Sequence, residues 1–127
     1  MEIVFYNRTG RPIAHTENST DIYLYTGELV AYLEDDSVYA CSGKHLGWFI
    51  DGWILDRDGK HVFFSDIATG GPARPTRQAS PGKAVRRSRP VKGTREPKPT
   101  YPERNPGWSH HASEEFFSTH PTGGHRP

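Results

Sequence analysis

Hydrophobic and polar residues recur along the first half of the chain in a repeat of about 16 residues. Aligned on Gly10, Gly27, Gly43 and Gly59, which are spaced by 17, 16 and 16 residues, the four units read "VFYNRTGRPIAHT", "DIYLYTGELVAYL", "SVYACSGKHLGWF" and "WILDRDGKHVFFS". A self-repeat of fixed period is the sequence signature of a repeat architecture. Each unit has an apolar segment on either side of a glycine turn, which predicts two short antiparallel strands.

The residue pairs that end in these glycines predict a two-residue hairpin loop, because glycine accepts the positive φ that such a turn requires. A loop of this length sets the register of each hairpin. It places on one face the pairs Tyr6–Ile13, Tyr23–Val30, Tyr39–Leu46 and Leu55–Val62, and on the other Phe5–Ala14, Ile22–Ala31, Val38–Gly47 and Ile54–Phe63. Small residues in the second set indicate close approach of neighbouring units around an axis.

The Gly-Lys pair at 43–44 has a second interpretation, a phosphate-binding loop. Such a loop needs a glycine five residues earlier and a hydroxyl residue directly afterwards. Val38 and His45 stand at those positions, and Glu28 stands where the second unit aligns with Lys44. The pair is therefore interpreted as a turn.

The four units resemble a known family, the four-fold beta flower family, over about residues 1–72. The matching segments are "EIVFYNRTGRPIAHTE", "IYLYTGELVAYLEDDSVY", "SGKHLGWFIDGWI" and "DGKHVFFSDIATGGP". The resemblance extends to a basic, proline-containing tail with "GWS" and "EEFF" near its end. It implies an all-β domain of four hairpins in pseudo-four-fold arrangement and supplies no activity, substrate or cofactor.

Charge and proline divide the chain after this repeat. Residues 1–70 carry 5 Lys/Arg against 11 Asp/Glu, whereas residues 71–127 carry 11 against 4 together with ten of the 11 prolines. A segment with so few aliphatic residues buries too little apolar surface to form a core of its own. We therefore expect a four-hairpin β domain at 1–70, a basic proline-rich extended tail at 71–106, and a short aromatic anchor with a disordered end at 107–127.

Basic residues recur in the tail at every third position. Nine of the eleven residues from 74 to 104 in this register are basic: Arg74, Arg77, Lys83, Arg86, Arg89, Lys92, Arg95, Lys98 and Arg104. A nine-residue repeat is superimposed, because Pro72, Pro81, Pro90 and Pro99 are each followed five residues later by an arginine. Polyproline II has three residues per turn, so the pattern predicts a rod with one cationic edge and a slim side able to lie against a surface.

Two kinds of partner suit a cationic rod. A nucleic acid such as RNA would give salt-dependent, largely sequence-independent contacts to phosphates. An acidic protein surface is the other, and the protein's own β domain or that of a neighbouring copy in a homo-oligomer is a candidate, with "LEDDS" at 33–37 as a charge match. Both interactions weaken with salt. The sequence predicts a non-enzymatic binding or assembly protein and leaves the partner open.

The segment "GWSHHASEEFF" carries the aromatic residues nearest the C-terminus. Trp108, Phe116 and Phe117 are predicted to anchor the tail on its own domain or in a partner's groove, with a short helix around Glu114 and Glu115.

Catalytic and metal chemistry is weakly indicated. A small enzyme with a site near His45, His61 and Cys41 is a further alternative, although the histidines occupy positions interpreted as a tolerant surface slot. The tail histidines His110, His111, His120 and His125 show no ligand spacing, so no metal and no cofactor is expected. The single cysteine excludes an internal disulfide, and we expect a cytoplasmic protein with no membrane segment and no small-molecule substrate.

Overall fold

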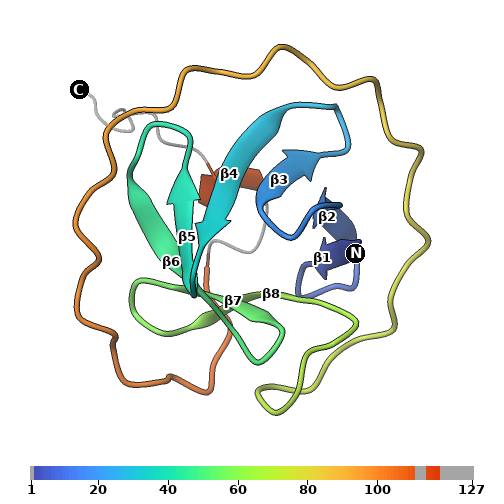
Figure 1. The fold of residues 1–127 in the computed structure, drawn as a ribbon. Helices are drawn as coiled ribbons and strands as arrows, with labels where there is room; N and C mark the ends of the chain where they lie inside the picture. The colour runs from blue at the N-terminus through green and yellow to red at the C-terminus, as the bar shows by residue number, and fades with distance from the viewer. Residues whose placement is uncertain (1, 111–113, 118–127) are drawn as a thin grey trace, which may run out of the picture.

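Eight antiparallel strands close into a barrel in the computed structural model, which describes residues 2–110 and 114–117 (Figure 1). The strands pair in chain order, so each glycine turn joins the two strands of one hairpin, and this confirms the predicted all-β fold of four hairpins. The elements are β1 (Ile3–Tyr6), β2 (Pro12–Thr16), β3 (Asp21–Leu24), β4 (Leu29–Glu34), β5 (Ser37–Ala40), β6 (His45–Ile50), β7 (Trp53–Asp56), β8 (His61–Phe64) and a 3-10 helix η1 (Glu114–Phe117).

The hairpin turns differ from the two-residue loops predicted. In the first hairpin the Asn7 amide donates to the Arg11 carbonyl and the Gly10 amide donates to the Asn7 carbonyl, both at 2.9 Å, which is a three-residue loop. Gly10 occupies the left-handed position of that loop, with φ +85°. The same two bonds recur in the other three hairpins.

A β-bulge next to each turn corrects the register farther along the strands. Phe5–Ala14 and its three equivalents pair as predicted, whereas the other predicted set is wrong: the observed pairs are Tyr6–Pro12, Tyr23–Leu29, Tyr39–His45 and Leu55–His61. The longer loop shifts pairing by one residue, and the extra residue of the bulge restores it. Ile13 therefore joins the inner core with Phe5, while Tyr6 faces outward in a separate cluster.

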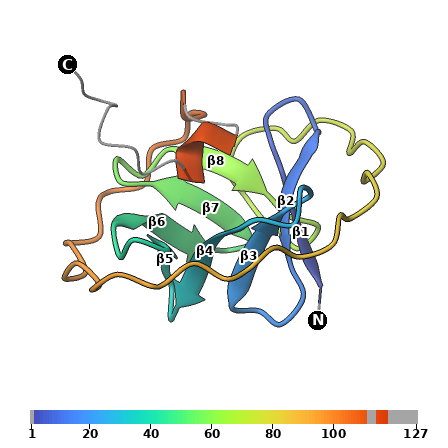
Figure 2. The same cartoon turned by 90° about the horizontal axis from the view of Figure 1, so that it is seen from above.

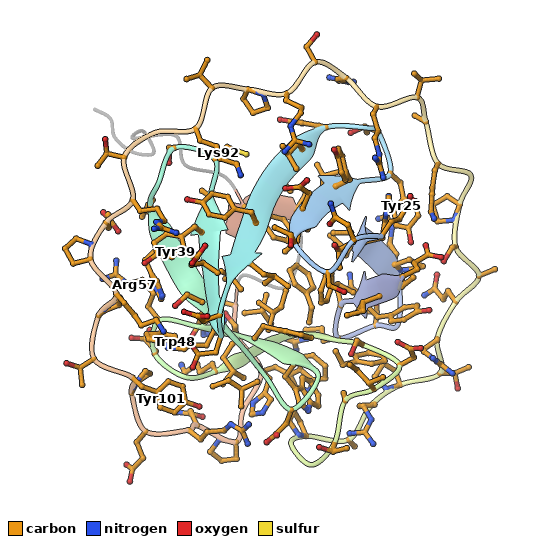
Figure 3. All side chains as sticks on the ribbon, in the orientation of Figure 1. Tyr25, Tyr39, Trp48, Arg57, Lys92 and Tyr101 are labelled. Carbon is orange, nitrogen blue, oxygen red and sulfur yellow. The ribbon has the colours of Figure 1, made fainter. Side chains whose placement is uncertain are left out.

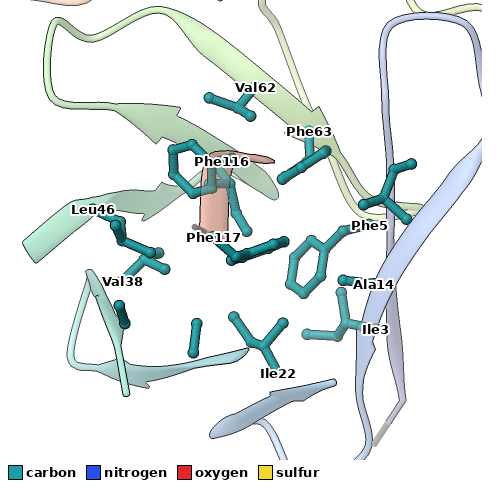
Figure 4. Packing of buried hydrophobic residues seen from close by; sticks show 14 residues of the cluster. Ile3, Phe5, Ala14, Ile22, Val38, Leu46, Val62, Phe63, Phe116 and Phe117 are labelled. Carbon is teal, nitrogen blue, oxygen red and sulfur yellow. The ribbon is translucent and has the colours of Figure 1, made fainter. Parts of the chain in front are cut away.

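Small residues let the strands surround a narrow core. The inner face carries Phe5, Ala14, Ile22, Val38 and Phe63, all fully buried (Figure 4). A side chain at Gly47 would lie 1.9 Å from the Leu55 carbonyl oxygen on β7, so glycine is required there for the two strands to pair. The predicted close approach around an axis is confirmed at this position.

Residues 74–105, hereafter the belt, contain no helix or strand and run around the outside of the barrel in a scalloped ring (Figures 1 and 2). The orientation predicted for this segment is wrong. Val85 and Val91, on the side expected to lie against a surface, are 89% and 94% exposed. The basic edge faces the barrel instead, because the barrel's outer face carries the acidic and aromatic residues that attract it.

The belt explains why both faces of the short strands are buried. Tyr6, Tyr23 and Tyr39 point out of the barrel, yet each is less than 9% exposed. No helix in the described part of the chain is long and apolar enough to span a membrane.

Candidate functional site: a basic belt bound to the barrel

The belt contacts the four hairpin glycines at intervals of nine residues. A Cβ added to Gly10, Gly27, Gly43 or Gly59 would lie 2.1, 2.1, 2.0 or 2.5 Å from the carbonyl oxygen of Thr76, Val85, Thr94 or Glu103, respectively. Such distances are below van der Waals contact, so any side chain would displace the belt. Each glycine thus serves both the turn and the close passage of a second backbone.

Backbone hydrogen bonds follow the same interval. The amides of Gln78, Arg87, Glu96 and Asn105 donate to the carbonyls of Gly10, Gly27, Gly43 and Gly59 at 2.8, 3.0, 2.8 and 3.1 Å. In the middle two repeats the amides of Ala84 and Gly93 also donate, to Tyr25 and Cys41. The corresponding belt positions in the outer repeats are Pro75 and Pro102, which have no amide hydrogen. Each turn is therefore a docking point for one belt repeat.

Cations of the belt lie over aromatic rings of the barrel's outer face. The guanidinium carbons of Arg77, Arg86 and Arg95 lie 5.8, 4.3 and 5.7 Å from the ring centroids of Tyr6, Tyr23 and Tyr39, which are equivalent positions in three hairpins. The Lys92 ammonium lies 4.2 Å from the Tyr32 ring, and Arg74 lies over Trp53. Tyr101 replaces a cation in the last repeat and meets Trp48 edge-on (Figure 3).

Ion pairs join the same belt residues to the rim of the barrel. The carboxylates concerned belong to Glu2, Glu17, Asp21, Glu34, Asp36 and Asp51. Arg86–Glu17, Arg95–Glu34 and Lys98–Asp36 each measure 2.8 Å, and Arg104–Asp51 measures 2.7 Å. Arg104 pairs with a carboxylate where the repeat offers Leu55 and no tyrosine. All nine basic residues predicted from the three-residue period thus contact the barrel of their own chain.

These contacts change the ionisation of both partners. The hydrogen bond from Lys98 lowers the pKa of Asp36, and the same bond raises the pKa of Lys98. Burial raises the pKa of Asp21, but hydrogen bonds from Arg89 and Asn18 outweigh it, so the pKa of Asp21 is lowered overall. The belt pairs are therefore charged at neutral pH.

Two aromatic contacts fix the chain after the belt. Trp108 packs against Trp53 and Phe64, and the adjoining backbone pairs with His61, whose amide donates to the Gly107 carbonyl at 3.0 Å. Phe116 and Phe117 lie on η1 inside the barrel, where Phe117 stacks on Phe63 and Phe116 meets the same ring edge-on (Figure 4). Trp108 precedes η1 and packs on the opposite, outer face. The structure thus places all three predicted anchors on the chain's own domain.

The residues of the enzyme alternative are not brought together. His45 accepts or donates a hydrogen bond with Ser37 at 3.0 Å, His61 faces Trp53 and Gly107, and the Cys41 thiol lies 3.5 Å from the Leu29 carbonyl. A cavity of about 230 Å³ is bordered by His45 but by neither His61 nor Cys41. The surface slot predicted for the histidines is wrong, since His45 and His61 are 0% and 1% exposed.

Burial sets the charge of these histidines and of the cysteine. It lowers the pKa of His45 and of His61 and raises the pKa of the Cys41 thiol. All three are thereby held in their neutral forms. Of the tail histidines, His110 is exposed, and His111, His120 and His125 lie outside the described residues.

The sequence interpretation missed the receiving half of the site. The sequence predicts the tyrosines only as one face of the sheet, and it gives most of the rim carboxylates no role. One feature of the sequence points to this pairing of tail and barrel: the barrel has four hairpin repeats, and the tail has four prolines at nine-residue spacing. One unit of tail per hairpin follows from these equal numbers.

Comparison with known proteins identifies one family. The model of the family described as "4-fold beta flower protein" matches residues 3–117, which include the barrel, the belt and η1. This confirms the resemblance seen in the sequence, including its extension to the tail. No curated protein and no solved structure matches the chain.

Proposed function

Because the chain belongs to the 4-fold beta flower family, which supplies a fold but no chemistry, we propose its function from the belt. The protein is a non-enzymatic assembly protein whose basic tail recognises an acidic, tyrosine-bearing barrel. In the isolated molecule that barrel is its own. In an assembly, the belt of one copy binds the barrel of another.

One observation carries this proposal: the repeat of the tail matches the repeat of the barrel. Thr76, Val85, Thr94 and Glu103 meet the four hairpin glycines in order, and the residue after each is an arginine that reaches a tyrosine or a carboxylate. A linker that merely happened to be basic would have no reason to keep a nine-residue period. A homo-oligomer follows when the same contacts form between copies, since exchange of an identical element needs no new surface.

Charge reversal on one side at a time tests this recognition. One variant carries Glu34→Lys and Asp36→Lys in the barrel, and a second carries Arg95→Glu and Lys98→Glu in the belt. Each variant alone loses the two ion pairs of the third belt repeat. Hydrogen exchange at the Glu96 amide, which bonds to Gly43 in that repeat, should therefore become faster. Mixed together, each belt complements the other variant's barrel, and light scattering should detect a one-to-one complex.

A chain that carries all four substitutions is the matched control. It restores opposite charges within one molecule, so it should be monomeric and should protect the Glu96 amide as the natural chain does. If the four-fold variant fails to restore protection, the belt is not held by these charges. If it does restore protection but the mixed variants form no complex, recognition between copies is refuted.

Nucleic acid is the second candidate, because the belt cations keep an exposed side. The side chains that pair with carboxylates remain between 35% and 54% exposed, so phosphates could contact them from outside. A nucleic acid function predicts that poly(U) RNA binds the natural chain at low salt, and that Arg95→Glu with Lys98→Glu weakens it. Assembly through the barrel predicts that RNA at equal concentration leaves the mixed complex intact.

A further inference from the structure

Three potential metal ligands meet where the first hairpin opens, at the end opposite its turn. Glu2 precedes β1, His15 lies in β2, and Glu17 follows β2. One ligand atom from each lies within 4.8 Å of the other two. Sheet geometry accounts for this: Ile3 pairs with Thr16, so Glu2 falls opposite Glu17, and His15 shares the face of Glu17 because side chains alternate along a strand.

The buried histidine of this group lacks a hydrogen bond. His15 is 3% exposed, and its Nδ1 has no hydrogen-bond partner among the described residues, although it lies 3.6 Å from a Glu17 carboxylate oxygen. A buried polar atom without a hydrogen-bond partner destabilises the fold, because it has lost its contact with water and gained nothing in return. A neutral imidazole nitrogen directed at two carboxylates is the arrangement in which histidine binds a metal ion.

A cation already stands at this position. The Lys83 ammonium pairs with both Glu2 and Glu17, at 3.0 Å from the latter, and Arg86 contacts the second oxygen of Glu17 at 2.8 Å. Two carboxylates directly opposite each other on neighbouring strands repel unless a positive charge lies between them. The ammonium donates to the two carboxylates, and no hydrogen bond joins it to His15 Nδ1, so the imidazole nitrogen is still without a partner among the described residues.

We propose that Glu2, His15 and Glu17 form a binding site for a divalent transition-metal ion of the zinc class, which exchanges with the Lys83 ammonium. One imidazole and two carboxylates leave a fourth position for water, as in three-ligand zinc sites. The imidazole disfavours magnesium and calcium, which take oxygen ligands. Bonds of about 2.0–2.1 Å require ligand atoms about 3.4 Å apart, a short movement for two exposed glutamates.

Metal binding at this site would release one belt cation. Lys83 belongs to the second belt repeat, whose Val85 and Arg87 contact Gly27. The proposal goes beyond the assembly function and does not depend on it, because the three ligands lie in the barrel or directly before it.

Titration of the full chain with Zn²⁺ or Co²⁺ tests the site. All arms carry His110, His111, His120 and His125 replaced by alanine, which removes incidental binding by the tail. One equivalent of Zn²⁺ should bind by calorimetry, and Co²⁺ should give a visible spectrum of a nitrogen- and oxygen-bound ion. Glu2→Gln and Glu17→Gln should each lower the affinity by about tenfold.

Two further variants distinguish binding at this site from unspecific binding of the metal ion by surface carboxylates. Lys83→Met should raise the affinity, because it removes the competing cation and leaves the ligands intact. Glu28→Gln with Asp66→Asn removes two exposed carboxylates elsewhere on the barrel and should leave the affinity unchanged. Absence of binding, a loss equal in this control, or a weaker affinity in Lys83→Met would each overturn the proposal.

Discussion

The core inside the barrel and the belt outside it follow the same four-fold repeat but are stabilised by different interactions. The core is made of apolar side chains such as Phe5, Ile22 and Phe63 that are fully removed from water. The belt offers few apolar groups, and Val85 and Val91 point into solvent. It is held by backbone hydrogen bonds at glycines, by cations over rings and by half-exposed ion pairs.

This difference predicts unequal stability. Ordering one residue costs about 1–2 kcal/mol, and exposed ion pairs return about 0–1 kcal/mol each, so a belt gains little from any single contact. It depends on all four repeats docking together. The barrel in turn depends on the belt, because the belt covers the outward-facing tyrosines.

The largest expected effect is a cavity in the core. Phe63→Ala removes the ring on which Phe116 and Phe117 pack, and we expect a loss of about 3–5 kcal/mol in the free energy of unfolding. Val85→Ala in the belt should change it by less than about 0.5 kcal/mol. Urea unfolding followed by tryptophan fluorescence measures both. Equal losses would contradict the division between an apolar core and a polar belt.

A side chain at a hairpin glycine should break the belt without touching the core. Gly27→Ala combines a positive φ of +91° with a clash against the Val85 carbonyl, and we expect a loss of about 2–4 kcal/mol. Gly70→Ala has a positive φ of +67° with no atom within 4 Å of the added Cβ, so about 1 kcal/mol is expected. Hydrogen exchange at the Arg87 amide locates the damage. Similar losses for both variants would show that the clash does not matter.

The barrel could be predicted from the sequence because each hairpin is formed by residues that are close together in the chain. Alternating apolar residues and a glycine turn specify two strands within a dozen residues, and the inner pairs such as Phe5–Ala14 followed directly. The turn length could not be predicted. A pair such as Thr9-Gly10 fits both a two-residue loop and a three-residue loop with glycine last, and the choice depends on the bulge at Ile13.

The belt could be predicted in part. Its period of three identified all nine cations that contact the barrel, but not which way they face. Nine residues of extended chain span up to about 28 Å, and only the contacts at the hairpin glycines show that nine residues of belt pass each hairpin. The burial of His45 and His61 was also missed, because Pro12 and Leu29 at the equivalent positions gave no sign that the site is covered.

The interior of the barrel and the belt should lose stability in different ranges of acidic pH. Burial lowers the pKa of His45, so the stability it contributes is present above its unfolded value of about 6.5 and is lost as pH falls from there toward the folded pKa. The Lys98 bond lowers the pKa of Asp36, so that contribution is lost only below about pH 4. Melting curves between pH 7.5 and 5 should therefore report the barrel alone.

His45→Gln checks this assignment. Between pH 6.5 and 5 the free energy of unfolding should fall less steeply with decreasing pH in this variant, by up to about 1.4 kcal/mol per pH unit. The reason is that no proton is then taken up at position 45 on unfolding. Asp36→Asn should leave this range unchanged and alter the curve only at lower pH. If the free energy of unfolding depended on pH in His45→Gln as it does in the natural chain, groups other than His45 would cause the acid sensitivity.

The smallest expected effect is the loss of one belt cation. Arg95 lies over the buried Tyr39 ring and pairs with the half-exposed Glu34 while its own side chain is half-exposed, so Arg95→Ala should cost about 1 kcal/mol. Arg87→Ala, which lies outside the three-residue register, is the matched control and should cost close to nothing. Added salt should reduce the part of this loss that comes from the ion pair with Glu34, because salt screens charges in contact with solvent. The part that comes from the contact with the Tyr39 ring should change little. If Arg87→Ala cost as much as Arg95→Ala in low salt, the belt would be held by its total charge, and the register that matches it to four hairpins would have no energetic role.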